Sequence, residues 1–209
     1  MKLYLSSYRI PNLSVLEILL GRKANETRVA LIPNAKDYHP IKLREEKIRK
    51  TSDYFRALGF SINIIDLKLY HNPTKLQDEL NNYDLIWVLG GNSFVIRCEI
   101  EKSGFDIVIR NLLSNGKTYG GESAGAIIAG NSLVGIEAAD DPRFADKVIL
   151  SGMNLTNHFI LPHVGNPLYN DSINIAKLTH QDDSSMIELS DSQVYVVDGS
   201  SSQVLSAEV

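Results

Sequence analysis

The segment Gly-Gly-Glu-Ser-Ala-Gly-Ala at 120–126 constrains the fold of this chain more than any other part of its sequence. Residues 117–119 before it are strand-like, and residues 126–129 after it are small and apolar, as at the start of a helix. A strand, a Gly-x-Ser-x-Gly turn and a helix form a nucleophile elbow, which projects the Ser123 hydroxyl over the carboxyl edge of a sheet. Gly121 and Gly125 lack side chains, so the strand and the helix can approach closely. The alternative is that the segment is only a glycine-rich turn before a helix.

Apolar segments alternate with amphipathic ones from the N-terminus to residue 129. We expect strands at 2–6, 27–32, 61–65 and 83–89, and helices at 13–21, 40–58, 74–82, 105–114 and from Ser93 onward. The helix at 40–58 is expected to turn these side chains inward: Ile41, Ile48, Tyr54, Phe55 and Leu58. Because the strands are nearly all apolar, the alternation predicts an α/β three-layer sandwich with a mostly parallel central sheet. Ligands bind such a sheet at the carboxyl ends of its strands, where the Gly90-Gly91-Asn92 turn and Ser123 are both expected.

The last third of the sequence is less regular. Residues 133–144 are expected to form a loop, and 167–178 a helix. Candidate strands lie at 148–151 and 159–162, followed by short antiparallel strands at 186–189, 193–197 and 203–206. The sequence shows no internal repeat, low-complexity segment or linker, so we expect a single domain over 1–209.

Composition excludes several classes of function. The 209 residues are 44% hydrophobic and 22% charged, as is typical of a globular chain. The net charge of −4 and the lack of a Lys/Arg cluster argue against a nucleic-acid partner. No run approaches the roughly 18 apolar residues of a membrane helix, and the N-terminus lacks the pattern of a signal peptide. The only cysteine, Cys98, is expected in a helical core or interface, so a reducing compartment is favoured and the protein is expected to be cytoplasmic.

A serine nucleophile needs a base within hydrogen-bonding reach, and the chain has five histidines. His163 follows the candidate strand at 159–162, so it is expected at the same sheet edge as the elbow. His158, at the other end of that strand, is the alternative base. We expect His39, His71 and His180 at the surface.

A third group should orient the imidazole. The downstream candidates are Asp182, Asp183, Glu188, Asp191 and Asp198. Asp191 is favoured because it comes just after the strand at 186–189, although a hairpin turn would have the same sequence. Asp140 and Asp141, in the loop that follows the elbow helix, are its rivals.

An oxyanion hole needs two donors, and the N–H of Ala124 and an amide of the Gly90-Gly91 turn are the candidates. A phosphate-binding turn is disfavoured because the segment lacks both the GxGxxG and the Walker spacing. The sequence also shows no metal-binding cluster, since His158 and His163 lie five apart on a strand and there is no cysteine pair. No cofactor is therefore expected.

Four segments occur in an order that resembles peptidase family S51, the peptidase E (aspartyl dipeptidase) group, which is related to cyanophycinase. They are Leu-Gly-Gly-Asn-Ser-Phe at 89–94, the elbow at 120–126, Leu-Pro-His at 161–163 and Leu-Ser-Asp at 189–191. The resemblance runs nearly end to end. It implies a class I glutamine amidotransferase-like (flavodoxin-like) sandwich in which serine replaces the usual elbow cysteine.

The same resemblance implies a role for each site residue. Ser123 would be the nucleophile, His163 the general base and Asp191 the acid that orients the histidine, a role for which the two loop aspartates remain rivals. Gly91 and Ala124 would supply the oxyanion amides.

The resemblance further implies that a basic residue downstream of the catalytic histidine binds the side chain of an N-terminal aspartate in the substrate. Residues 165–181 contain no arginine, and Lys177 is their only cation, so Arg97 and Arg143 are the candidate substitutes and Asp-X specificity stays open. Glu122 either adds a negative charge at the mouth of the site or points to solvent.

We therefore expect a dipeptidase E-like serine peptidase that hydrolyses short peptides, as a monomer or homodimer. The alternative is a non-catalytic member of the same fold that binds a small ligand or a partner. An amidotransferase with another nucleophile is disfavoured, because the elbow carries serine and Cys98 is expected on a helix.

Overall fold

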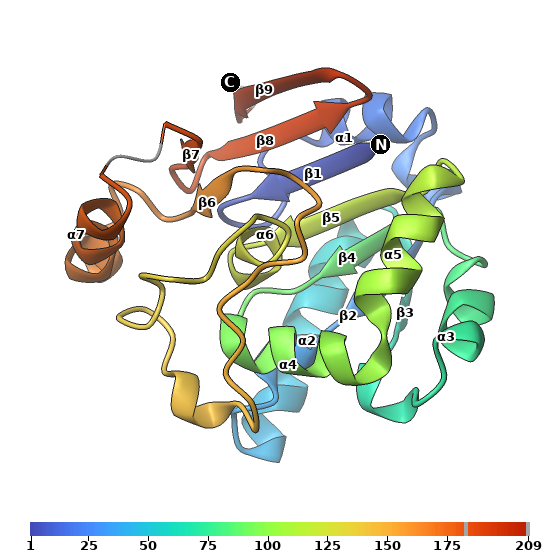
Figure 1. The fold of residues 1–209 in the computed structure, drawn as a ribbon. Coiled ribbons are helices and arrows are strands. Elements are labelled where there is room, and N and C mark those ends of the chain that lie inside the picture. The colour runs from blue at the N-terminus through green and yellow to red at the C-terminus, as the bar shows by residue number, and fades with distance from the viewer. Residues whose placement is uncertain (182–183, 208–209) are drawn as a thin grey trace.

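The computed structural model describes residues 1–181 and 184–207, and over these residues its main sheet has seven strands (Figure 1). The strands are β1 (Lys2–Ser6), β2 (Arg28–Ile32), β3 (Ser61–Ile64), β4 (Leu85–Val88), β5 (Thr118–Glu122), β8 (Gln193–Asp198) and β9 (Ser201–Ser206). Their order is β3-β2-β4-β5-β1-β8-β9. The first five pair in parallel, β8 is antiparallel to β1, and β9 is antiparallel to β8. The expected mostly parallel central sheet is thus confirmed.

Helices cover both faces of this sheet (Figure 1). They are α1 (Leu13–Leu20), α2 (Ile41–Ala57), α3 (Pro73–Leu80), α4 (Ser93–Ser103), α5 (Phe105–Ser114), α6 (Ala124–Ile127) and α7 (Asn170–Thr179). Short 3₁₀ helices connect them: η1 (Ala24–Glu26), η2 (Asn34–Lys36), η3 (Leu67–Leu69), η4 (Pro142–Phe144) and η5 (Pro167–Tyr169). None of the helices in the described residues is both long and apolar enough to cross a bilayer.

Side chains on successive strand residues divide between two apolar cores, as the two-residue period of a strand requires. In β4, Ile86 and Val88 join the core under α3, α4 and α5, whereas Leu85 and Trp87 join the core under α1 and α2. Since both faces are covered, the strands need to be apolar throughout, which explains the near-continuous hydrophobic runs in the sequence.

The helix boundaries follow from capping residues. The Asn12 side chain accepts a hydrogen bond from Val15 N at the start of α1, and Asn92 accepts bonds from the N–H groups of Phe94 and Val95 at the start of α4. Gly21 ends α1 in the left-handed conformation, as expected from the sequence.

One inward residue of α2 was predicted wrongly. Ile48 and Phe55 are buried, but Ile41 is 75% exposed. The 17-residue helix is roughly 25 Å long, whereas the five-residue strand β2 beneath it spans about 17 Å. The first turn of α2 therefore extends past the edge of the core, and Ile41 has nothing to pack against.

The chain after the elbow also differs from expectation. The elbow helix α6 is a single turn, Ala124–Ile127, and 148–151 forms no strand beyond an isolated bridge between Ser151 and Ser132. Strand β7 (Met186–Glu188) pairs in parallel with β6 (Phe159–Leu161), outside the main sheet, and is not antiparallel as predicted. Helix α7 lies between β6 and β7 in the chain and supplies the crossover that a parallel pair needs.

Candidate active site

Ser123 occupies a strained turn between β5 and α6. Its backbone has φ 50° and ψ −113°, outside the regions that residues with a side chain usually occupy. A Cβ on Gly121 would collide with the carbonyl group of Gly125, and a Cβ on Gly125 would collide with that of Val88. Both positions therefore require glycine, and the strand, turn and helix have the close packing expected of an elbow.

The imidazole of His163 bridges Ser123 and Asp191. Its Nε2 lies 2.9 Å from Ser123 Oγ, and its Nδ1 lies 2.6 Å from Asp191 Oδ1. His163 follows the end of β6, and Asp191 follows the end of β7. Because β6 and β7 are parallel neighbours, the segments after them leave the pair on the same side, which brings the two side chains together.

Two further side chains hold this pair, and sequence reasoning missed both. Ser7 Oγ donates to Asp191 Oδ1 at 2.8 Å and accepts from His163 N at 2.8 Å. Asn166 Nδ2 donates to Asp191 Oδ2 at 2.7 Å. Ser7 follows the end of β1, so the rule that ligands bind at the carboxyl edge of the sheet was the one signal that would have indicated it.

These contacts lower the pKa of the Asp191 carboxyl group. Burial alone would raise the pKa of its carboxyl group. The hydrogen bonds from His163, Ser7 and Asn166 act in the opposite direction and lower the pKa below its ordinary value. The carboxyl group is therefore held as a carboxylate beside the imidazole.

The rival acids lie elsewhere. Asp140 lines the same cavity but accepts from Ser93 N at 2.8 Å, and burial raises its pKa. Asp141 is ion-paired with Arg143 at 2.7 Å.

The downstream candidates are not at the site either. Glu188 pairs with Lys177, and Asp198 lies at the opposite end of the sheet because β8 runs antiparallel to β1. Asp182 and Asp183 lie outside the described residues.

The structure separates the other histidines from Ser123, with one partial exception. His158 Nδ1 contacts the carbonyl oxygen of Ser185 at 2.8 Å, and His158 is not among the residues that line the cavity in front of Ser123. His180 is half-buried and stacks on Phe159, contrary to the surface position expected for it. His39 was also expected at the surface, but it is half-buried and lines the cavity in front of Ser123. His71 is exposed, as expected.

The Gly90-Gly91 turn lies against the nucleophile. A Cβ on Gly90 would be 3.1 Å from the Cβ of Ser123, and Gly91 has φ 153°, with no room for a Cβ next to the carbonyl oxygen of Ala35. Lys36 Nζ donates to the Gly90 carbonyl oxygen at 2.7 Å. Because C=O and N–H point in opposite directions across a trans peptide, this bond directs the Gly91 N–H away from Lys36.

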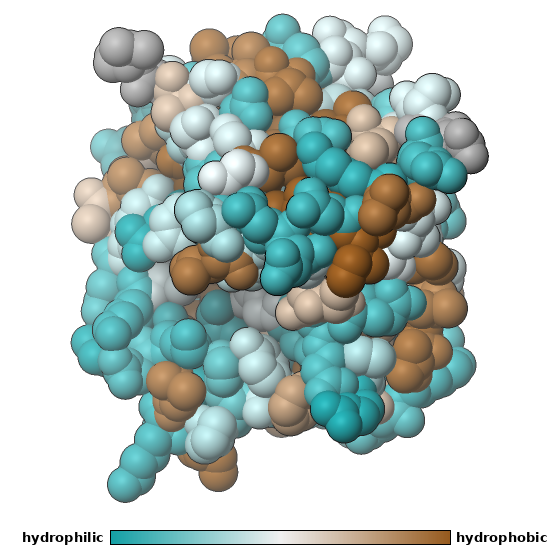
Figure 2. Space-filling view, turned by 90° about the vertical axis from the view of Figure 1, so that its left-hand side faces the viewer, coloured by the Kyte–Doolittle hydropathy of each residue, from teal (hydrophilic) through white to brown (hydrophobic). Residues whose placement is uncertain are grey.

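A cavity of about 370 Å³ opens in front of Ser123. It lies at the carboxyl edge of the sheet, on the face that Figure 2 shows, where hydrophilic and hydrophobic side chains are mixed. Polar residues that line it include Ser7, Lys36, His39, Lys47, Glu122 and Asp140, and apolar ones include Ile127, Ile136, Leu161 and Ile173. Within residues 1–181 and 184–207, no group of three or more His, Cys, Asp or Glu side chains is arranged to hold a metal ion.

Glu122 does not point to solvent. It is 8% exposed, and its carboxylate accepts hydrogen bonds from the backbone N–H groups of Arg9 at 3.1 Å and Gly90 at 3.4 Å. The negative charge of Glu122 is thus partly compensated by backbone N–H groups, one of which belongs to the Gly90-Gly91 turn.

The cations proposed from the sequence for an acidic substrate do not line this cavity. Arg97 is buried, donates to the Ser151 carbonyl oxygen at 2.9 Å and lies 3.8 Å from Asp106. Arg143 is ion-paired with Asp141, and Lys177 is ion-paired with Glu188. The cations that do line the cavity are Lys36 and Lys47, which come from η2 and α2.

Comparison with known proteins agrees with this fold. The model of peptidase family S51 matches residues 7–205. The "Uncharacterized peptidase Lin0382" of Listeria innocua is 29% identical over 139 residues, which are 66% of this chain and 65% of that protein. A "Peptidase E" of Nostoc sp. is 31% identical over 140 residues, which are 66% of this chain and 53% of that protein. The matched segments thus cover less than two thirds of the length of these relatives.

Solved structures extend the likeness over almost the whole chain. A Listeria monocytogenes EGD-e protein that is named after peptidase E superposes with a TM-score of 0.81, covering 99% of this chain and 98% of that one at 22% identity. A peptidase from an acI-B1 Actinobacterium superposes with a TM-score of 0.71, covering 98% and 87% at 18% identity. At these identities the superpositions show a shared fold.

Proposed function

This chain belongs to peptidase family S51, and on that premise we propose that it is a serine peptidase that hydrolyses short peptides. In this proposal Ser123 is the nucleophile, His163 the general base and Asp191 the acid that orients the base. The observation that carries the proposal is the continuous line of contacts through the imidazole, 2.9 Å to Ser123 Oγ and 2.6 Å to Asp191 Oδ1. A nucleophile, a base and an orienting group at such distances are the arrangement that activates a serine.

The reaction then proceeds in two halves. Ser123 Oγ attacks the scissile carbonyl carbon while His163 Nε2 takes the hydroxyl proton, and Asp191 stabilises the resulting imidazolium. The N–H groups of Gly91 and Ala124 hold the oxyanion of the tetrahedral intermediate. His163 gives its proton to the leaving amine, and a water molecule, deprotonated by the same imidazole, releases the acyl group from Ser123.

The cavity supports a small substrate. Its volume of about 370 Å³ is at the lower end of the roughly 300–1,000 Å³ of small-molecule sites. A short peptide fits this volume better than a folded polypeptide, which needs an open groove. A single domain over 1–209 that acts as a monomer or homodimer is part of the same proposal.

Turnover of a dipeptide panel by the wild-type protein and by Ser123→Ala tests the assignment. We expect hydrolysis by the wild type and a loss of at least about 10³-fold in the variant. A fluorophosphonate should label the wild type at Ser123, and His163→Ala should abolish the labelling. Undiminished hydrolysis by Ser123→Ala would refute the nucleophile, and an unlabelled, inactive wild type would favour a non-catalytic, ligand-binding member of the family.

A further inference from the structure

We propose that Lys36, supported by Lys47 and His39, forms a subsite that binds a carboxylate group of the substrate. That the bound molecule is a substrate depends on the function proposed above, whereas the subsite is inferred from the charged side chains that line the cavity. These residues come from η2, from α2 and from the turn between them, which precede His163 in the sequence, whereas the segment that the family resemblance indicated follows it.

The ammonium of Lys36 has unused hydrogen-bonding capacity. Its side chain is half-buried in the cavity wall, and its one hydrogen bond in the described structure goes to the Gly90 carbonyl oxygen at 2.7 Å. An ammonium carries three donors, and the neighbouring carboxylate of Asp37 pairs with Arg44 and Lys68 instead of with this one. Burial lowers the pKa of Lys36, and the charge of Glu122 opposes this shift without forming an ion pair.

A second lysine and a histidine line the cavity near Lys36. Lys47 also lines it and makes no ion pair within the described part of the chain. His39 lies beside both lysines, and its pKa is lowered by burial and by the charges of Lys47 and Lys36. An anionic group bound here would therefore relieve the repulsion between the two lysines, and the neutral His39 could donate a hydrogen bond to it.

The carboxylates that face the cavity are engaged in other contacts. Glu122 opposes the lowering of the Lys36 pKa, but its oxygens accept the backbone N–H groups of Arg9 and Gly90. Asp140 accepts Ser93 N, and burial raises its pKa, so it competes weakly for a cation. Neither carboxylate forms an ion pair with Lys36.

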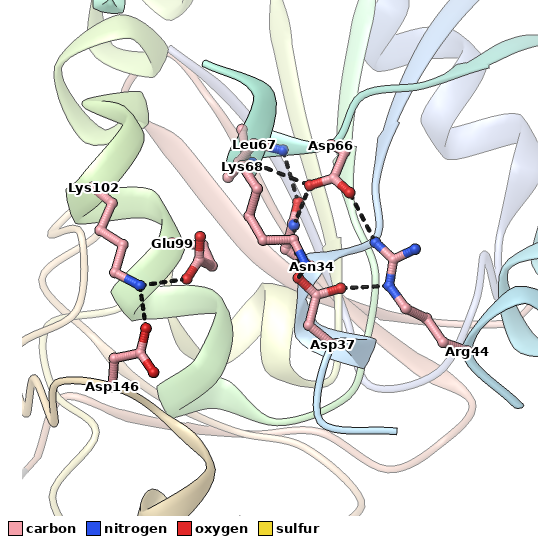
Figure 3. A network of polar contacts seen from close by, with 9 residues as sticks. All are labelled: Asn34, Asp37, Arg44, Asp66, Leu67, Lys68, Glu99, Lys102 and Asp146. Atoms are coloured by element: carbon pink, nitrogen blue, oxygen red, sulfur yellow. Dashed lines mark hydrogen bonds and ion pairs between the residues drawn. The ribbon is translucent and has the colours of Figure 1, made fainter. Parts of the chain in front are cut away.

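Two cations near the 34–37 turn, Arg44 and Lys68, are already paired with carboxylates (Figure 3). The buried Asn34 side chain donates to Asp37 at 2.9 Å and to Asp66 at 2.7 Å. Arg44 contacts both carboxylates, and Lys68 pairs with Asp37 at 2.9 Å. This network holds the 34–37 turn and pairs Arg44 and Lys68 with carboxylates. Lys36 and Lys47 therefore remain available to a ligand.

The position of Lys36 distinguishes this subsite from the oxyanion hole. Lys36 binds the C=O edge of the Gly90–Gly91 peptide, whereas the oxyanion would bind the N–H on its opposite edge. The carboxylate at Lys36 is therefore a second group of the molecule whose carbonyl reacts at Ser123. In a short peptide this group is either the C-terminal carboxylate or an acidic side chain.

Binding to the Ser123→Ala protein tests the subsite without turnover. The probes are Asp-Leu, Asn-Leu and the C-terminal amides of both, measured by calorimetry. We expect at least one carboxylate to tighten binding by roughly tenfold to a hundredfold over its amide partner, as for a charged hydrogen bond. Loss of affinity in the C-terminal amides would identify the C-terminal carboxylate, and loss in the Asn peptides would identify the side chain.

The matched variants are Lys36→Met and Lys42→Met, each in the Ser123→Ala background. Lys42 is exposed at the start of α2 and does not line the cavity. Lys36→Met should remove the preference for the carboxylate and leave the binding of Asn-Leu amide, which has no carboxylate, within about threefold, whereas Lys42→Met should keep the preference. Equal binding of all four peptides, or a preference that survives Lys36→Met, would overturn the proposal.

A second measurement needs no change at Lys36. The ammonium loses its proton as the pH rises through a pKa below the ordinary 10.5, so the affinity ratio of carboxylate to amide peptide should fall as the pH rises from neutral toward 10.5. A ratio that stays constant over this range would count against Lys36. A wild type that hydrolyses nothing while Ser123→Ala discriminates between the peptides would refute the peptidase function and leave the subsite standing.

Discussion

Ser7 Oγ lies 2.8 Å from Asp191 Oδ1, although 184 positions separate the two residues in the chain. The same hydroxyl accepts the backbone N–H of His163 at 2.8 Å. The buried Ser7, which directly follows β1, thus contacts both Asp191 and His163, which come from segments outside the main sheet. The geometry of the site depends on how these segments dock onto β1.

Removal of this hydroxyl should slow catalysis without weakening substrate binding. We expect Ser7→Ala to lower kcat by roughly tenfold or more, with KM little changed, because a hydrogen bond to a charged group is lost and Asp191 is freed to move. Ser6→Ala is the matched control, since Ser6 is equally buried but its hydroxyl donates to backbone carbonyl groups. Steady-state kinetics on one dipeptide suffices, and equal losses in the two variants would contradict the role of Ser7.

The two candidate acids should differ sharply in their effect on activity. Asp191→Asn should lower kcat by about 10⁴-fold, as expected when the group that orients a catalytic histidine is neutralised. Asp140→Asn should cost less than about tenfold, because the amide oxygen can still accept Ser93 N. The ratio of the two kcat values is the measurement, and a larger loss at Asp140 would reverse the assignment.

Asp140 should destabilise the fold at neutral pH. Its folded pKa is raised above the ordinary 3.8, mainly by burial, so the folded state keeps a proton that the unfolded chain loses. The free energy of unfolding therefore falls as the pH rises from about 3.8 through the folded pKa. Asp140→Asn should be more stable than the wild type in urea at about pH 7 and equal to it at about pH 3. A stability difference that does not change with pH would contradict the raised pKa.

Gly91 should tolerate no side chain. In Gly91→Ala the new Cβ would meet the Ala35 carbonyl group, and φ is 153°. Gly116→Ala is the control for backbone strain alone, because Gly116 has φ 84° with open space around it. We expect the control to lose about 1–3 kcal/mol of unfolding free energy, and Gly91→Ala to lose more and to react slowly with a fluorophosphonate. Similar values for both variants would show that the turn can move aside.

Much of the fold was predictable because the information is local. Apolar runs marked the strands, and Gly21 marked the end of the first helix, since capping needs only neighbouring residues. The elbow was predictable for the same reason, since it requires small residues at fixed positions in one short segment.

Long-range pairing was not predictable. The parallel pairing of β6 with β7 depends on a crossover through α7, whereas the sequence of β7 alone suits either direction. No sequence motif singled out Lys36, and its place in the cavity in front of Ser123 follows from the pairing of β2 with β4, which brings η2 next to the Gly90-Gly91 turn.

By itself, the sequence determined the elements, their alternation and the strained turn at Ser123, because periodicity and glycine placement act within about ten residues. Only the tertiary structure decided which acid meets His163, that Ser7 holds them both, and which cations face the cavity. Those contacts join residues that follow β1, β6 and β7, and they join η2 to the turn after β4. The physical reason is that they depend on strand order and docking, which arise from burial of the whole sheet and not from any one segment.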